Sequence, residues 1–141
     1  MLGIDHAMPM LTEARIRAQA AGLRVSYARA SAQHVPIASQ HATAIVIGGS
    51  LNEIGDLARC LREVRRVLAR GGRFAAMSLT THPRAFERFV QRILAPSGIQ
   101  FWPTDQLLRH IATAGLQLEE QRQIGIVLFT RASLNDTPVV H

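Results

Sequence analysis

The fold of this chain is decided by the stretch EVRRVLARGGRF, which runs from Glu63 to Phe74 and leads directly into the apolar run Ala75 to Leu79. Apolar residues recur here at steps of four, three and four, a spacing that gathers them on one face of a helix: Leu57, Leu61, Val64 and Leu68. We predict that Gly71 and Gly72 end this helix, because glycine adopts the left-handed conformation beyond a helix at little cost. A strand is expected from Arg73 to Leu79. A helix that ends on glycines and leads into a buried strand is typical of an α/β crossover.

Length and composition indicate one globular domain. The chain has 141 residues, of which 48% are hydrophobic and 18% charged. No apolar run approaches the roughly 20 residues that a membrane helix needs. The first residues lack the charged segment and long apolar stretch of a signal peptide, so a cytoplasmic location is expected.

Arginine alone supplies the positive charge behind the net charge of +6, since the sequence contains no lysine. The arginines are spread over the predicted helices, which favours solvated helix faces over a dedicated nucleic-acid surface. Cys60 is the single cysteine, and we interpret it as a packed thiol without a catalytic role. The six histidines show no metal-ligand spacing, so we expect no metal site.

The first residues, Leu2 to Asp5, are predicted to form a short buried strand that ends in a carboxylate. A helix follows, with Pro9 in its first turn and Gly22 at its end. In nucleotide-binding α/β folds, an acidic residue at a strand end accepts hydrogen bonds from the ribose hydroxyls. Asp5 suits that task, and the alternative is a strand-end cap or a surface charge.

Two further strands are predicted before the decisive stretch. Arg24 to Ala28 alternates weakly, whereas Ala42 to Ile47 is a continuous apolar run, suited to a strand that is covered on both faces. Gly48 and Gly49 follow at the carboxyl end of this second strand, where open α/β sheets bind their ligands. Two glycines there allow a ligand to approach the backbone closely.

Several phrases together resemble class I S-adenosylmethionine-dependent methyltransferases. The stretch from Arg66 to Phe74 is similar to the family phrase "RVLKPGGRL", and GIDHAMPML, from Gly3 to Leu11, is similar to "GvDxSxxML". TDQLLRHIATAGL, from Thr104 to Leu116, resembles "eeLxxlLxxAGF". The resemblance implies an α/β, Rossmann-like sheet, mostly parallel with a C-terminal antiparallel pair. It also implies S-adenosyl-L-methionine as cofactor and methyl transfer to a small organic acceptor.

The resemblance also implies a set of cofactor-binding residues. Asp5 would accept from the ribose and Met10 would pack against the adenine; the complete set is Asp5, His6, Met10, Ser31, Ala32 and Gly48. The sequence departs from the family at two points. Ser31 stands where the family has an acidic acceptor for the adenine amino group, and Thr43 stands where the family has an aspartate before the fourth strand.

Candidates for the substrate side are Gly49, Asn52 and Trp102, while no residue is assigned as the catalytic base. Asn52 could equally cap the helix that starts near Asp56. Trp102 follows an amphipathic helix expected from Arg84 to Leu94, and the resemblance implies that this region covers the active-site mouth. Filling the core is an equal alternative for Trp102, and His34 is interpreted as a surface residue rather than a base.

The C-terminal part is predicted to form a helix and a strand pair. Thr104 is expected to cap a helix that Gly115 closes. A polar strand, Leu116 to Gln123, and an apolar strand, Ile124 to Thr130, are expected to pair antiparallel at the sheet edge. We place the domain at residues 1–131 and a polar tail at residues 132–141.

One family element is missing from the sequence: the first strand and its Gly-rich turn, which should precede an acidic residue like Asp5 by about 20 residues. In the family's strand order, 3-2-1-4-5-7-6, that strand lies between strands 2 and 4, so its absence leaves a gap of roughly 9–10 Å. Strand 2 could pair directly with strand 4, a partner chain could fill the gap, as in a homo-oligomer that completes the sheet, or the true start could lie upstream. The alternative function is a non-catalytic remnant that acts as an interaction or oligomerisation module.

Overall fold

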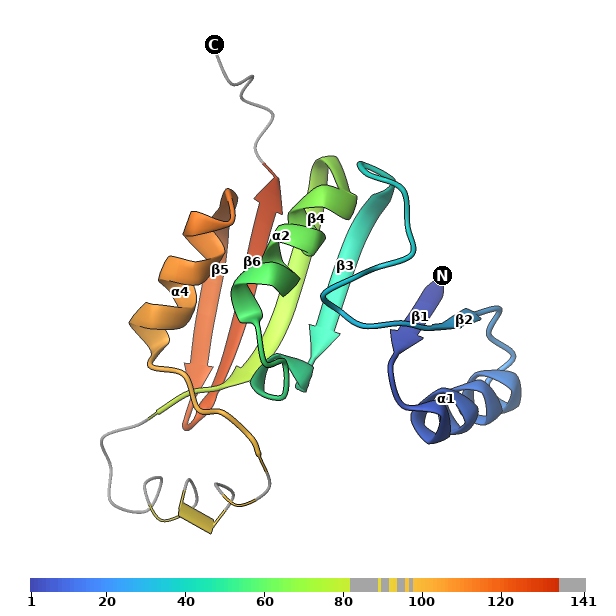
Figure 1. The fold of residues 1–141 in the computed structure, drawn as a ribbon, viewed down its shortest axis with the longest axis horizontal. Helices are drawn as coiled ribbons and strands as arrows, with labels where there is room; N and C mark the ends of the chain where they lie inside the picture. The colour runs from blue at the N-terminus through green and yellow to red at the C-terminus, as the bar shows by residue number, and fades with distance from the viewer. Residues whose placement is uncertain (82–88, 90–91, 94–95, 97, 135–141) are drawn as a thin grey trace.

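The computed structural model describes residues 1–81, 89, 92–93, 96 and 98–134, and it has the predicted α/β architecture (Figure 1). None of the helices in this described part is long and apolar enough to cross a bilayer. The helix expected between residues 84 and 94 lies largely outside the described residues. The elements in chain order are β1 (Leu2–Asp5), α1 (Met8–Ala20), β2 (Ser26–Arg29), β3 (Ala42–Gly48), the 3-10 helix η1 (Ser50–Asn52), α2 (Leu57–Val67), β4 (Leu68–Leu79), α4 (Thr104–Thr113), β5 (Leu116–Ile124) and β6 (Val127–Leu134).

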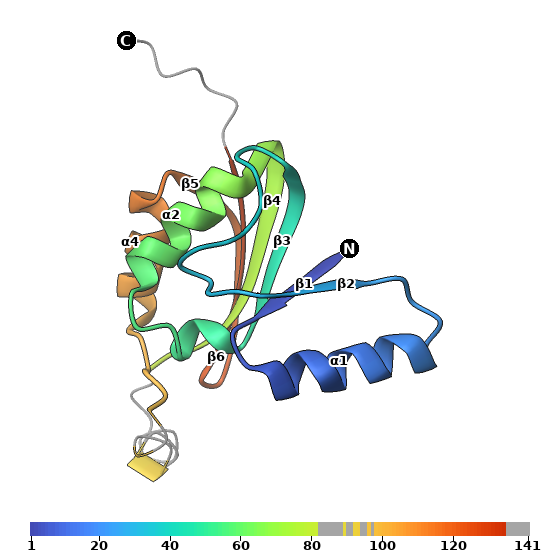
Figure 2. The same ribbon diagram turned by 45° about the vertical axis from the view of Figure 1, so that its right-hand side comes forward.

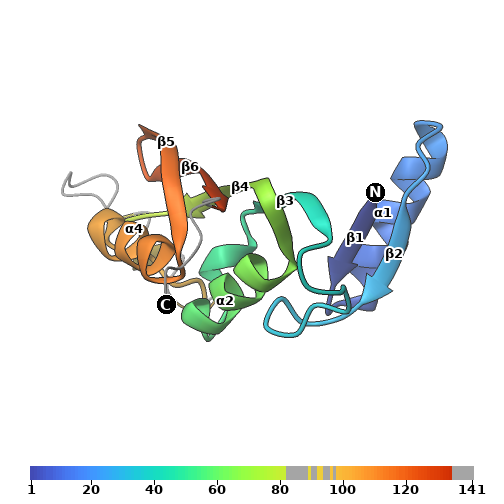
Figure 3. The ribbon, with the colours of Figure 1, turned by 90° about the horizontal axis from the view of Figure 1, so that it is seen from above.

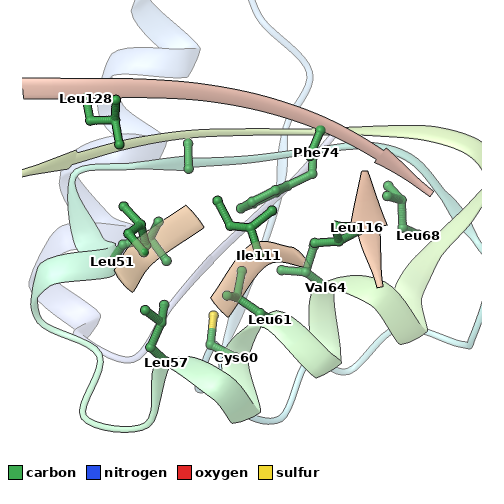
Figure 4. Close-up of a cluster of buried hydrophobic side chains, with 13 residues drawn as sticks. Leu51, Leu57, Cys60, Leu61, Val64, Leu68, Phe74, Ile111, Leu116 and Leu128 are labelled. Atoms are coloured by element: carbon green, nitrogen blue, oxygen red, sulfur yellow. The ribbon is translucent and has the colours of Figure 1, made fainter. Parts of the chain in front are cut away.

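Strand β4 is a central strand of the larger sheet, and helix α2 packs against the core on one side of it, as the decisive stretch predicts. The apolar stripe is confirmed, because its four side chains are each at most 4% exposed. The Asp56 side chain caps α2 by accepting a hydrogen bond of 2.9 Å from the Arg59 amide. The stripe packs against β4 and α4, and Figure 4 shows its side chains converging with Phe74 and Ile111 in one core.

The prediction that two glycines end α2 is wrong. The helix ends at Val67, and Leu68 is already extended, with φ −68° and ψ 127°. The amides of Gln40 and His41 each donate a hydrogen bond of 2.8 Å, to the carbonyls of Arg66 and Val67 respectively. Because a distant loop satisfies these terminal carbonyls, the helix needs no left-handed glycine at its end.

The two glycines instead shape the start of β4. Gly71 has a positive φ of 67°, and a Cβ at Gly72 would lie 2.7 Å from the carbonyl oxygen of Ala69. The ladder with β3 also shifts here, since Ala42 pairs with Leu68 and Ala44 with Arg73. We expected the strand to begin at Arg73, but it begins five residues earlier. Its first part contains a tight turn that excludes larger side chains.

The larger sheet has four strands in the order β3-β4-β6-β5. The β3–β4 ladder is parallel, and the two ladders of β6 are antiparallel. This confirms the expected C-terminal antiparallel pair at the sheet edge. Helices α2 and α4 lie together on one side of this sheet, as the view from above shows (Figure 3).

A smaller, two-stranded sheet is formed by the N-terminal residues, where β1 pairs parallel with β2 and α1 packs on both. The Tyr27 hydroxyl donates a hydrogen bond of 2.9 Å to the Ala14 carbonyl, which ties β2 to α1. Gly3 is needed beside this ring, because a Cβ there would lie 2.8 Å from Tyr27 Cδ1. Strand β2 begins at Ser26, two residues later than predicted.

The described residues contain no ladder between β1 and β3, so the two sheets remain separate. Direct pairing of these two strands, one of the three expected outcomes, is therefore wrong. The strand order otherwise agrees with the family order with its first strand left out. Strands β1 and β3 point the same way on either side of the gap (Figures 1 and 2).

The expectation that both faces of β3 are covered is also wrong in this structure. Ile45 and Ile47 pack against the core under α2, but Val46 on the other face is 75% exposed. Met77 in β4 is only partly buried and Phe129 in β6 is 42% exposed, so the uncovered face extends across the sheet. We call this surface, formed by Val46, Met77 and Phe129, the bare face.

The C-terminal elements follow the prediction with two corrections. Helix α4 begins at Thr104, but the residue before it, Pro103, is its N-cap and supplies no side-chain bond. The Thr104 hydroxyl instead lies 3.3 Å from Gln123 Oε1. Gly115, with φ 80°, follows the helix as expected. Strand β6 continues to Leu134, three residues past the expected end of the domain at residue 131.

Candidate functional site

The predicted cofactor residues gather where parallel strands end. Asp5 is the last residue of β1, Ser31 follows the end of β2, and Gly48 is the last residue of β3. Carboxyl ends of parallel strands lie at the same edge of a sheet, which is the usual ligand edge in open α/β folds. The structure thus brings these three residues to one edge, on both sides of the gap.

Asp5 is held in place by its own turn. Its Oδ1 accepts a hydrogen bond of 2.8 Å from the Ala7 amide. The Asp5 side chain is 33% exposed, and no described residue bonds its second oxygen, Oδ2. A carboxylate with one oxygen fixed and the other open to solvent can accept hydrogen bonds from a hydroxylated ligand.

His6 follows Asp5 directly, Met10 lies in the first turn of α1, and both side chains are open to solvent. The His6 side chain is 83% exposed, with Nδ1 3.5 Å from Asp5 Oδ1. Arg29 Nε donates a hydrogen bond of 3.0 Å to the His6 carbonyl, so the end of β2 fixes this turn. Met10, in the first turn of α1, is 60% exposed and offers a free thioether surface.

Ser31 and Ala32 lie at the start of the connector, which we define as residues 31–41 between β2 and β3. Ser31 Oγ accepts a hydrogen bond of 3.1 Å from the Gln33 amide, and Ser31 forms a bridge with His34. Ala32 packs against the core beneath α2. His34 is exposed, as predicted, and its Nδ1 lies 3.1 Å from the Arg59 guanidinium.

The connector is fixed to α2 by an ion pair that the sequence reading missed. Glu63 accepts from the Val35 amide at 2.9 Å and pairs with Arg66 through both carboxylate oxygens, at 2.7 and 2.9 Å. Arg66 also donates to the carbonyls of Val35 and Ile37, each at 2.9 Å. The sequence feature that could have predicted this ion pair is the i,i+3 spacing of Glu63 and Arg66 on one helix.

These contacts change the acidity of Glu63. The hydrogen bond from Arg66 is the main cause that lowers the pKa of Glu63 from 4.5 to about 2, and the Val35 amide adds to it. Glu63 therefore stays charged well into acid solution and keeps hold of the connector. Since Ser31 and Ala32 are in the same connector, this pair indirectly positions two predicted cofactor residues.

The substrate-side candidates lie in different surroundings. Gly49 has a positive φ of 82°, and a Cβ there would lie 3.3 Å from the Met77 Cε. Glycine therefore fits this position better than residues with a side chain. Asn52 is 1% exposed, and its amide bonds the backbone of Leu79 and of Gln100. Asn52 thus ties η1 to the end of β4 and to the segment before α4.

Trp102 adjoins the core rather than standing free. It forms a bridge with Thr80, packs against the buried cluster and contacts His110 edge to face at 5.8 Å between ring centroids. Cys60 is fully buried, and desolvation is the main cause that raises the pKa of its thiol to about 11. A thiol with so high a pKa is not an active nucleophile at neutral pH.

The chemistry at this edge suits part of an adenosine-containing ligand. Asp5 offers a hydroxyl acceptor, Met10 an apolar surface and Gly48 open space, since nothing lies within 4 Å of a Cβ built there. Within the described residues, no group of three or more histidine, cysteine or acidic side chains could hold a metal ion. The Asp5 carboxylate and the Met10 side chain are thus chemically suited to the ribose and the adenine of S-adenosylmethionine, respectively.

Comparison with known proteins agrees with this geometry. The family described as "Methyltransferase domain" matches residues 1–76, which is more than half of the chain. This chain belongs to the methyltransferase domain family. A demethylmenaquinone methyltransferase from Thermus thermophilus is 33% identical to it over 93 residues, which cover 66% of this chain and 42% of that protein. The chain thus spans less than half the length of this curated relative.

Solved structures show the same fold. Geranyl diphosphate C-methyltransferase from Streptomyces coelicolor A3(2), in complex with Mg²⁺, geranyl diphosphate and S-adenosyl-L-homocysteine, matches with a TM-score of 0.80 and 15% identity. The match covers 94% of this chain and 64% of that one. The cyclase SpnF matches with a TM-score of 0.73 and 24% identity, over 86% of this chain and 43% of that one. The fold is therefore that of Rossmann-like methyltransferases, and it also occurs in a cyclase.

Proposed function

We propose that this chain carries part of an S-adenosylmethionine-dependent methyltransferase site and serves methyl transfer to a small organic acceptor. The observation that carries the proposal is Asp5 at the carboxyl end of β1, with Oδ1 fixed by the Ala7 amide and Oδ2 open. Membership of the methyltransferase domain family supports it.

S-Adenosylmethionine, when bound, supplies a methyl group on a positively charged sulfur. Asp5 would accept hydrogen bonds from its ribose hydroxyls, and the His6 backbone, fixed by Arg29, would hold that turn. Met10 and Ala32 would flank the adenine, Ser31 Oγ would accept from its amino group, and Gly48 would allow close approach of the backbone. These roles are proposals from the family resemblance and from the positions described above.

The transfer itself is a displacement that depends mainly on bringing donor and acceptor together in line. The chain would contribute a wall for the acceptor from Gly49 and Trp102, with Asn52 holding that wall through its backbone bonds. We assign no proton acceptor at this edge.

A second candidate is a non-catalytic module of the same fold that acts in interaction or oligomerisation. The open edges of β1 and β3 favour it, because unpaired backbone groups in an apolar setting attract partners. A homo-oligomer that completes the sheet belongs to this hypothesis. The cytoplasmic location and the lack of a nucleic-acid partner remain predictions.

Calorimetric titration of the purified chain with S-adenosylhomocysteine separates the two candidates. We expect near-stoichiometric binding, and we expect Asp5→Asn to weaken it by about tenfold or more, because a charged acceptor is lost. Asp105→Asn is the matched control, since Asp105 makes an exposed ion pair with Arg109 on α4. No heat with the unchanged chain, or equal binding by both variants, would contradict the proposed site.

A further inference from the structure

The outer face of helix α2 carries three arginines that no carboxylate neutralises. Arg59, Arg62 and Arg65 follow one another at steps of three residues, and all three are exposed. The Arg59 guanidinium lies 3.1 Å from His34 Nδ1, whereas the side chains of Arg62 and Arg65 make no hydrogen bond or ion pair in the described part of the chain. We call these three arginines the arginine ridge.

Helix α2 itself does not supply the missing negative charge. Glu63 is the single acidic residue within its bounds, and both carboxylate oxygens of Glu63 are bound to Arg66. Side chains three and four positions apart are neighbours on a helix surface, and the four such neighbours of Arg62 are one alanine and three arginines. Like charges at this spacing repel one another and destabilise a helix. An anionic partner would relieve this repulsion.

The arginine ridge lies between α4 and the connector (Figure 1). At one flank, Arg65 extends over the glycine that follows α4, because a Cβ built on Gly115 would lie 2.7 Å from Arg65 Nε. At the other flank, Arg59 reaches His34 in the connector. Neither α2 nor α4 carries an exposed large apolar side chain. The ridge therefore offers positive charge and guanidinium donors rather than an apolar contact.

The dimensions of the ridge favour carboxylates over a nucleic-acid backbone as its ligands. Because a helix rises 1.5 Å per residue, the Cα atoms of Arg59 and Arg65 are only about 9 Å apart along α2. The exposed carboxylates of Glu53 and Asp56 precede the ridge and would repel a phosphate chain that continued past it. Single strands also bind through aromatic rings on which their bases stack, and α2 and α4 contain no phenylalanine, tyrosine or tryptophan.

We propose that the arginine ridge is a docking surface for a short acidic helix of a partner protein. Acidic residues three or four positions apart line one face of a helix at a rise of about 4.5–6 Å, which matches the step of about 4.5 Å between the arginines of the ridge. Each guanidinium can donate to both oxygens of one carboxylate.

A second copy of the chain does not provide this helix within its described residues. Helices α1, α2 and α4 each contain a single acidic residue, namely Glu13, Glu63 and Asp105. Each of these carboxylates is already paired with an arginine of its own helix. The acidic face must therefore come from a different protein.

The test is fluorescence anisotropy of a labelled synthetic peptide with the full chain in a buffer of low ionic strength. The peptide is an alanine-rich helix with three glutamates on one face. The control peptide has the same composition and net charge, but its glutamates are spread evenly around the helix. We expect saturable binding of the first peptide, with the control peptide at least tenfold weaker. Added salt should weaken the binding, because it screens exposed charges.

Matched variants of the chain locate the binding. Arg62→Glu, in the middle of the ridge, should weaken peptide binding at least tenfold, whereas Arg122→Glu, at an exposed position of β5, should change it less than twofold. Both variants change the net charge equally, and equal unfolding midpoints would show that both fold. If Arg62→Glu does not fold, Arg62→Gln takes its place, again with weaker binding expected.

Three results would overturn the proposal: equal binding of the two peptides, equal effects of the variants at positions 62 and 122, or no binding. Tighter binding of a labelled oligonucleotide that is lost in Arg62→Glu would overturn it in favour of a nucleic-acid partner. The test needs no cofactor, so its result is independent of the proposed methyl transfer.

Discussion

Asn52 shows at the residue scale how one side chain joins segments that are distant in sequence. Its Nδ2 donates to the Leu79 carbonyl at 2.7 Å and to the Gln100 carbonyl, and its Oδ1 accepts from the Leu79 amide at 2.7 Å. The sequence suggested a helix cap or a substrate contact for Asn52. These partners were invisible in the sequence, because they depend on how β4 and the residues before α4 meet.

We predict that Asn52→Ala lowers the free energy of unfolding by about 2–4 kcal/mol, because it removes the hydrogen bonds that this buried side chain makes to the backbone of Leu79 and Gln100. Urea denaturation measures the change. Gln121→Ala, at an exposed position of β5, is the control and should stay within about 0.5 kcal/mol. A loss for Asn52→Ala no larger than that of the control would show that water replaces the amide without cost.

Glu63 gives a prediction for acid stability. The Arg66 hydrogen bond lowers its folded pKa from 4.5 to about 2, so its stabilising contribution is complete above about pH 4.5 and is lost as the pH falls towards 2. The urea midpoint should therefore drop over this window. Glu63→Gln should flatten that part of the profile, while Glu13→Gln, in an exposed pair with Arg17, should preserve it. A profile for Glu63→Gln that falls as steeply as that of the unchanged chain would contradict the role of this pair.

At the scale of elements, periodicity and glycine signals predict most of the fold correctly. The stripe in α2, the strands β1 and β3, and the C-terminal helix and hairpin all lie close to their expected positions. The predicted end of α2 was wrong, because the amides of Gln40 and His41, in a distant loop, bond to the last carbonyls of the helix. Tertiary contacts of this kind outweigh the local tendency of glycine to end a helix, and no pattern in the sequence predicts them.

The turn at the start of β4 provides a matched pair of glycine variants. A Cβ at Gly72 would lie 2.7 Å from the Ala69 carbonyl oxygen, whereas a Cβ at Gly55 would meet nothing within 4 Å. We expect Gly72→Ala to destabilise the chain by more than about 1 kcal/mol and Gly55→Ala to be neutral or slightly stabilising. Thermal unfolding compares them, and equal melting temperatures would refute the close approach at Gly72.

At the scale of the whole molecule, the structure is a methyltransferase sheet with one strand position unfilled. The sequence predicted that one strand of the family's sheet is missing and left open whether its neighbours pair directly; in the described residues, β1 and β3 do not pair. The sequence could not predict which surfaces the gap leaves open, because exposure of Val46 and Phe129 depends on the complete arrangement of both sheets. The candidate cofactor residues lie on both sides of the gap, so we expect a strand in the gap to affect cofactor binding.

The most direct test of the unfilled strand position is NMR-detected hydrogen exchange of the 141-residue chain, at concentrations where light scattering shows a monomer. We predict the slowest exchange in β4 and β6, which have a neighbour on each side. The amides of β1 and β3 that point into the gap should exchange as fast as those on the outer edge of β5. If every amide of β1 and β3 were instead as protected as those of β4, the two edges would be paired in solution, which would contradict the open gap.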